Sequence, residues 1–189
     1  MANEANCSVF IVTTIVVCLL ASVVGFVMID CAINKPWYSA VIDSVTGLDP
    51  ATDLARPSLD PLFNLTLCVA SPSHMLTECI EPGTNVEVTY HGVLLASGPA
   101  HRLCAGPRKV PRGQAVITRG HGVRVPGFVL DRLAEDMRRG VGSFDVTLTM
   151  PPTHKSNHEA LVSCRARWIG DIAALQTPCD AFNTDIMWA

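Results

Sequence analysis

The chain has 189 residues, of which 49% are hydrophobic, 6% aromatic and 16% charged, and its formal net charge is −3. An ordinary soluble domain carries about 25% charged residues, so an apolar segment must lie outside a normal core. The slightly acidic charge excludes a strongly basic nucleic-acid binder, and the length leaves room for one domain beside the apolar segment rather than two.

The apolar segment comes first in the chain, because no charged residue occurs between Glu4 and Asp30. Residues 7–29 would span about 35 Å as a helix, enough to cross a hydrocarbon core of roughly 30 Å. We expect residues 1–6 to form a short N-terminal tail and residues 7–29 a single, uncleaved transmembrane helix, since the start lacks the positive charge of a signal peptide. A cleaved signal and a buried core helix are the alternatives. Ala21 and Gly25 have a spacing that lets two such helices pack, so a homo-oligomer remains open.

The rest of the chain has the pattern of a mainly β domain. Residues 30–60 are expected to contain a juxtamembrane segment, a first strand at 39–45 and a turn-rich acidic linker, and residues 61–189 the remainder of the domain. Alternation of apolar and polar residues predicts strands at 62–69, 86–90, 93–96, 114–125, 144–150 and 161–168. Residues 129–139 have one apolar face and are expected to form the one soluble helix. Together these elements predict a β-sandwich with one crossover helix.

The cysteines and a glycosylation sequon give information on the cellular compartment of the β domain. Six of the eight cysteines lie beyond the apolar segment. Cys79 and Cys104 flank the predicted 86–96 hairpin, and Cys164 and Cys179 bracket a strand and its return, which favours these two disulfides among 15 pairings. Six free thiols in a cytosolic domain are the alternative. Asn64 starts an Asn-Leu-Thr glycosylation sequon and also favours a lumenal or extracellular domain, whereas the basic residue at 35 weakly favours the cytosol.

The basic residues are segregated along the chain. No acidic residue occurs between Glu87 and Asp131, a stretch that contains Arg102, Arg108, Lys109, Arg112, Arg119 and Arg124. One basic face built from these side chains would bind an anionic surface such as lipid head groups or acidic wall polysaccharide. The alternative is that strand geometry scatters them over both edges of the sheet.

Motifs for catalysis and cofactors are weak. His154 and His158 have the spacing of metal ligands and Glu159 is adjacent, but the prolines at 151–152 predict a solvated loop, which gives that spacing no common face. The sequence contains no nucleophile elbow and no phosphate-binding glycine loop. We therefore expect a non-enzymatic protein with no cofactor and no nucleic-acid partner.

Several of these features together resemble a known plant family. The N-terminal anchor, the run Pro-Leu-Phe-Asn-Leu-Thr-Leu at 61–67 and the run Val-Glu-Val-Thr-Tyr-His-Gly-Val-Leu-Leu-Ala-Ser-Gly at 86–98 are similar to the late embryogenesis abundant type 2 domain. More closely, they resemble the harpin-induced-like, disease-resistance-like membrane proteins of plants, over roughly residues 37–170. The resemblance implies an immunoglobulin-like or fibronectin-like β-sandwich on a single-pass anchor, an outward-facing domain linked to defence and stress, and no catalytic residues.

The leading expectation is a single-pass protein of the plant plasma membrane whose β domain faces the apoplast and binds a protein, lipid or wall-polysaccharide ligand during defence or stress. The alternative is a cytosolic domain that binds or transfers lipid. A hydrolase is a third class, which nothing specific in the sequence favours.

Overall fold

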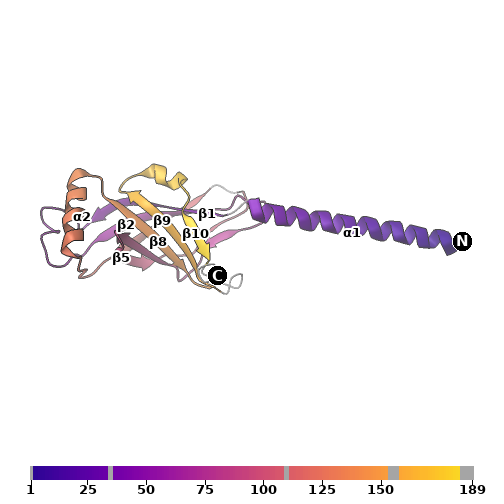
Figure 1. Cartoon of the computed structure of the whole chain (residues 1–189), viewed down its shortest axis with the longest axis horizontal. Helices are drawn as coiled ribbons and strands as arrows, with labels where there is room; N and C mark the ends of the chain where they lie inside the picture. The colour runs from indigo at the N-terminus through magenta and orange to yellow at the C-terminus, as the bar shows by residue number, and fades with distance from the viewer. Residues whose placement is uncertain (1, 34–35, 109–110, 153–157, 184–189) are drawn as a thin grey trace.

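The computed structural model describes residues 2–33, 36–108, 111–152 and 158–183, which form a long N-terminal helix and a β domain (Figure 1). The elements, in chain order, are α1 (Ala2–Ile33), β1 (Trp37–Thr46), β2 (Leu62–Ala70), β3 (Glu78–Ile80), β4 (Asn85–Tyr90), β5 (Val93–Pro99), β6 (Leu103–Ala105), β7 (Arg112–Arg119), α2 (Gly127–Arg139), β8 (Ser143–Met150), β9 (Ala160–Trp168), the 3₁₀ helix η1 (Ile172–Gln176) and β10 (Asp180–Asn183).

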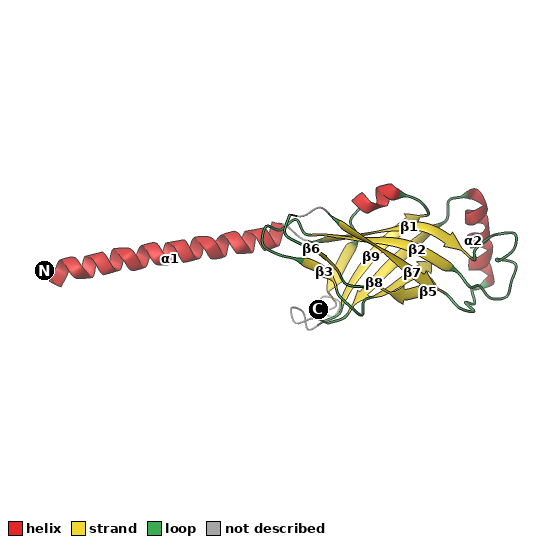
Figure 2. Cartoon of the chain, turned by 180° about the vertical axis from the view of Figure 1, so that it is seen from behind, coloured by secondary structure: helices red, strands yellow, loops and turns green. Residues whose placement is uncertain are grey.

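The helix α1 is longer than the predicted 7–29 segment, because it begins at Ala2 and ends at Ile33. The tail expected at 1–6 is therefore helical from Ala2. The stretch Val12–Asp30 has a mean hydropathy of 2.7, and its large apolar side chains are exposed rather than buried against the domain. Figure 2 shows α1 extending away from the β domain rather than packing on it. The helix is thus not part of a buried core, and it has the length and composition of a membrane span or a signal sequence.

Most of the β domain is one antiparallel sheet of eight strands in the order β1-β2-β7-β5-β4-β8-β9-β10, and β3 and β6 form a separate pair. Burial alternates residue by residue along β2, β4 and β8. That period of two is the one the sequence predicted, and it places one face of each strand inside. The described residues therefore form a mainly β domain.

The sheet curls until its first strand approaches β9. Ile42 of β1 pairs with Ile169 in a parallel bridge, and the Gly170 N–H donates to the Ile42 carbonyl at 2.7 Å. Farther along β1, the Cys179 N–H donates to the Tyr38 carbonyl at 2.8 Å. The segment 169–179, which contains η1, thus fills the seam between β1 and β9. We call residues 169–179 the seam segment.

The core lies inside the curled sheet and centres on three aromatic rings. The Phe63 and Phe144 centroids are 5.3 Å apart in an edge-to-face arrangement, and Tyr90 and Phe144 are 5.7 Å apart. All three side chains are almost completely buried. Aromatic rings in such contacts contribute more than their buried area alone, so this cluster ties β2, β4 and β8 together.

The helix α2 closes the end of the domain opposite α1 (Figure 1). Its apolar face buries Val129 and Leu133, and it ends at Gly140, whose φ of 68° is the left-handed conformation that terminates helices. It connects β7 to β8, which are separated in the sheet by the β4–β5 hairpin. We call this end of the domain, formed by the 91–92 turn, the 120–126 loop and α2, the distal end.

Several elements differ from the sequence prediction. The strand predicted at 114–125 ends at Arg119, and α2 begins at Gly127 rather than at residue 129. A Cβ atom on Gly120 would lie 2.0 Å from the Leu95 carbonyl oxygen, and the Gly120 N–H instead donates to Pro61. The chain therefore leaves the sheet at this glycine. The strands β3, β6 and β10 were not predicted.

Candidate functional site

Two disulfides reinforce the β domain. Cys79 of β3 is bonded to Cys104 of β6, and Cys164 of β9 is bonded to Cys179, which directly precedes β10. These are the two pairs that the sequence favoured. Disulfides persist in oxidising compartments, so both bonds point to an extracellular or lumenal environment for the domain.

The free thiol of Cys68 lies half-buried on the outer face of β2. Burial raises the pKa of the Cys68 thiol, and the neighbouring Asp43 carboxylate raises it further. A thiol with a raised pKa forms little of the reactive thiolate. Burial and the neighbouring Asp43 carboxylate therefore both disfavour the thiolate form of Cys68.

The sequon asparagine lies on the outer face of the sheet. Asn64 is half-buried in β2, and its Nδ2 donates a hydrogen bond of 2.8 Å to the Ser44 hydroxyl of β1. Across the sheet it is opposite Ile117 of β7, which is 52% exposed. A glycan on Asn64 would project from the outer face of β2, near the start of that strand, and away from the core.

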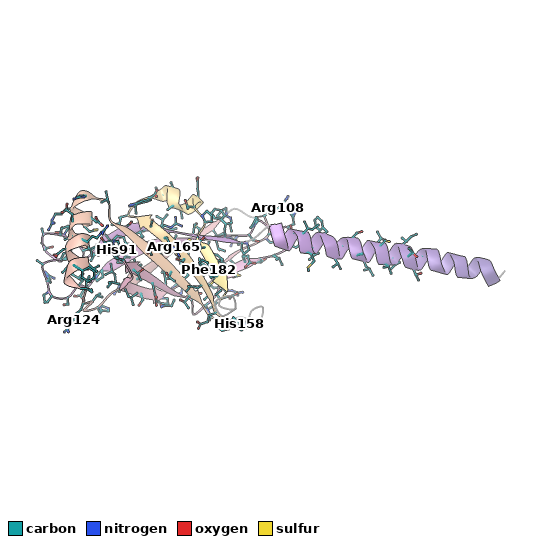
Figure 3. The ribbon with its side chains drawn as sticks, in the orientation of Figure 1. His91, Arg108, Arg124, His158, Arg165 and Phe182 are labelled. Carbon is teal, nitrogen blue, oxygen red and sulfur yellow. A yellow bond between two sulfur atoms is a disulfide. The ribbon has the colours of Figure 1, made fainter. Side chains whose placement is uncertain are left out.

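The basic residues do not gather on one face. Figure 3 places Arg108 beside the end of α1 and Arg124 at the distal end. Arg112 and Arg119 lie at opposite ends of β7, and the Arg102 guanidinium is 3.8 Å from Glu81. Lys109 lies outside the described residues. The five described cations are therefore divided between the two ends of the domain, because β7 runs along its length.

The histidine spacing gives no metal site in the part of the chain that the structure describes. His154 lies outside it, and His158 lies at the end of the domain near α1 (Figure 3). Within the described residues no three His, Cys, Asp or Glu side chains are grouped to hold a metal ion.

A pocket of about 250 Å³ opens at the distal end, between the β4–β5 turn and the start of α2. Its lining consists of His91, Gly92, Val93, Pro126, Phe128, Val129 and Arg132. Phe128 is 80% exposed, although it lies beside the buried face of α2. The pocket thus combines an exposed aromatic ring with a guanidinium and an imidazole, a set that fits an anionic ligand with an apolar surface. We call it the distal pocket.

A hydrogen bond joins the end of β4 to α2 next to the distal pocket. The Tyr90 hydroxyl donates to the Asp136 carboxylate at 2.6 Å, and the Tyr90 ring meets His91 edge-to-face with centroids 4.5 Å apart. Burial raises the pKa of Tyr90 to about 12, the bond to Asp136 adds to the shift, and Arg132 opposes it. The phenol is therefore neutral and remains a donor at physiological pH.

A second hollow of about 300 Å³ lies along the first half of β5. Its lining consists of Leu94, Leu95, Ala96, Ser97, Arg119, Gly120, His121 and Val123. These residues come from β5, from the end of β7 and from the loop that follows β7, and the two strands share the register pair Ser97 with Arg119.

The distal pocket was not predicted from the sequence, because residues 91–93 and 126–132 are brought together only by the fold. One signal was present. Phe128 directly precedes the apolar stripe of α2 yet does not belong to it, and a large apolar residue in that position is a candidate contact residue.

Comparison with known proteins gives no relative for this chain: no family model, no curated protein and no solved structure matches it.

Proposed function

We propose that this chain is a non-enzymatic, membrane-anchored binding protein whose β domain lies outside the cell and presents its distal end to an acidic ligand. The observation that carries the proposal is the arrangement of the molecule. A disulfide-reinforced domain is attached at one end to an exposed apolar helix, and a pocket opens at the other end. An uncleaved α1 would hold the domain at the membrane surface with the pocket directed away from it.

The location follows from the disulfides and the resemblance to plant proteins. Two disulfides favour an oxidising compartment, and the similarity to late embryogenesis abundant type 2 membrane proteins favours the apoplastic side of the plant plasma membrane. The proposal includes the family's role in defence or stress and its immunoglobulin- or fibronectin-like arrangement of strands. Pairing of two chains through Ala21 and Gly25 of α1 is compatible with it.

The ligand class follows from the distal pocket. Arg132 and His91 supply positive charge or hydrogen-bond donors, and the Phe128 ring supplies an apolar face. Arginine forms bidentate bonds with carboxylates, and sugar rings stack on aromatic side chains through their C–H faces. An acidic wall polysaccharide carries both features in each repeating unit, so it fits the pocket better than a neutral glucan.

A binding assay with matched variants tests this proposal. Full-length protein in nanodiscs would be applied to immobilised polygalacturonate fragments and to a neutral glucan. Arg132→Gln is expected to weaken binding to polygalacturonate about tenfold, as loss of one charge-assisted contact implies. Arg165→Gln is the control, because Arg165 is an exposed cation on β9, labelled in Figure 3, that does not line the pocket.

Two results would contradict the proposed ligand. Equal loss in both variants would mean that binding reports overall charge rather than the distal pocket. Equal binding to the acidic and neutral glycans would remove the role of the Arg132 guanidinium.

A further inference from the structure

The end of α1 is bonded to a loop of the β domain. Asp30 closes the apolar stretch of α1, and its side chain is only 5% exposed. The Ser73 hydroxyl donates to the Asp30 carboxylate at 2.5 Å, and the His74 N–H donates to the same oxygen at 3.3 Å. A buried carboxylate with these partners fixes the loop against the helix end.

The loop has a defined shape of its own. The Ser73 hydroxyl oxygen accepts hydrogen bonds from the N–H groups of Met75 and Leu76, both at 3.1 Å. The Ser71 hydroxyl donates to the Leu76 carbonyl at 2.7 Å, and the Arg108 N–H donates to the carbonyls of Ser71 and Ser73, both at 3.1 Å. Local bonds thus satisfy much of the loop's polar backbone, which is what a segment needs in order to enter a poorly hydrated layer.

The outer side of this loop is apolar. Met75 is 57% exposed and Leu76 is 38% exposed, although both residues belong to a bonded turn. Figure 3 places Arg108 at the same junction with α1. The loop therefore combines two exposed apolar side chains with a cation, a combination that suits the boundary between acyl chains and anionic head groups.

The position of this loop relative to the membrane surface follows from its contact with Asp30. The apolar stretch ends at Asp30, so this residue lies at the membrane–water boundary if α1 spans a bilayer. His74 is bonded to Asp30, and the next Cα atom, that of Met75, is about 3.8 Å from the His74 Cα atom. Met75 must then lie at the level of the head groups.

We infer that residues 71–76 form a membrane-docking loop that inserts Met75 and Leu76 into the surface of the same bilayer that α1 crosses. The inference rests on the proposal that α1 is kept as an anchor. The contact between Asp30 and Ser73 holds the loop at this depth, so the β domain has a fixed orientation and does not swing freely on the helix. The distal pocket is consequently held at the greatest distance from the bilayer.

Photo-crosslinking to lipid tests the docking loop in the full-length chain. The photoreactive amino acid p-benzoylphenylalanine would replace Met75, Leu20 or Phe128 in separate preparations, each in nanodiscs of phosphatidylcholine and phosphatidylserine. Leu20 is an exposed position in α1 and tests the anchor, and Phe128 is an exposed position at the distal end. Mass spectrometry is expected to find lipid adducts at positions 20 and 75 and none at 128.

The outcomes separate the two proposals. An adduct at position 20 without one at 75 would overturn the docking loop and leave the anchor in place. No adduct at position 20 would overturn the anchor itself. Asp30→Ala and Ser73→Ala, each combined with the probe at 75, are expected to reduce the adduct there several-fold and to leave the adduct at 20 unchanged. Unchanged crosslinking at 75 in both variants would refute the role of the Asp30–Ser73 contact.

Discussion

The Cys164–Cys179 disulfide bonds the end of the seam segment to β9, so its removal should cost more than its loop length implies. It bonds β9 to the end of the seam segment, where the Cys179 N–H also donates to Tyr38 of β1. The Arg167 guanidinium reaches across the same seam, with Nη2 at 3.0 Å from the Thr177 carbonyl oxygen and at 3.4 Å from the Cys179 Sγ. Replacing both cysteines by alanine would free the seam segment from β9.

The magnitude follows from a comparison of the two disulfides. With sequence separations of 15 and 25 residues, the chain-entropy relation gives a loss of unfolding free energy of about 3 kcal/mol for Cys164–Cys179 and about 3.5 kcal/mol for Cys79–Cys104. Cys164 is buried, whereas Cys79 and Cys104 are half-buried. Loss of the hydrogen bonds from Arg167 to the seam carbonyls adds about 1–3 kcal/mol to the loss of unfolding free energy. We therefore expect a loss of about 4–6 kcal/mol in unfolding free energy for the seam disulfide, which reverses the order given by loop length.

Urea unfolding of the full-length protein in detergent micelles measures this difference. With a slope of about 2 kcal/mol per molar urea, the Cys164→Ala/Cys179→Ala variant should lose about 2–3 M in its unfolding midpoint. Tryptophan fluorescence is a suitable signal, because Trp37 and Trp168 lie in the strands that border the seam. A smaller loss in this variant than in Cys79→Ala/Cys104→Ala would refute the reasoning that the seam segment stabilises the domain.

Three further predictions concern single residues. The protein has two tyrosines, Tyr38 and Tyr90, and burial raises the pKa of both to about 12, so the stability that they contribute should be fully present below pH 10 and decline as the pH rises toward about 12. Absorbance titration should find no phenolate below pH 10, and ionisation below that pH without unfolding would contradict the burial. Gly120→Ala should prevent stable folding, because the new Cβ atom would lie 2.0 Å from a backbone oxygen, whereas Gly127→Ala, with no atom within 4 Å of its Cβ position, should have no such effect. Limited proteolysis compares the two variants, and equal protease resistance would refute the clash. Arg167→Met should leave the carbonyls of Ala174 and Thr177 without this donor and should speed amide hydrogen exchange in residues 172–179. Unchanged exchange there would show that the guanidinium does not hold the seam segment.

The strongly periodic elements were predictable from sequence. β8 alternates over its whole length and β2 over all but its last residue, and β4 and β5 flank a His-Gly turn in which both residues have positive φ. Each carries enough residues for a period to be recognised. β3 and β6 have only three residues each and are held by their pairing and a disulfide, so they are too short to show a repeating pattern in the sequence.

The inward position of Arg167 shows where the two-residue period misleads. Simple alternation from the buried Cys164 would point residue 166 inward and Arg167 outward. Ala166 instead has a φ of 50°, and its N–H donates to the Asp145 carboxylate at 2.8 Å. This bulge shifts the alternation by one residue, so Arg167 becomes buried and bonds the seam segment. A side-chain bond between neighbouring strands decides this, and no local pattern encodes it.

The candidate site was predictable only in part. The cysteine pairs follow from their positions around single hairpins, which is local information. The basic residues are close in sequence, which left one basic face or scattering by strand geometry open, and β7 separates Arg112 and Arg119 by the length of a strand. The distal pocket depends on contact between the 91–93 turn and α2, which only the tertiary fold provides.

The side of the membrane on which the β domain lies tests the central claim most directly. Full-length protein would be expressed in plant cells, and wild type compared with Asn64→Gln for a glycosidase-sensitive gel shift and for thiol labelling without reductant. The account predicts a shift that is lost in the variant and four protected cysteines, those of the two disulfides. The absence of a shift together with fully reactive thiols would contradict an extracellular domain and would favour a cytosolic lipid-binding or lipid-transfer module instead.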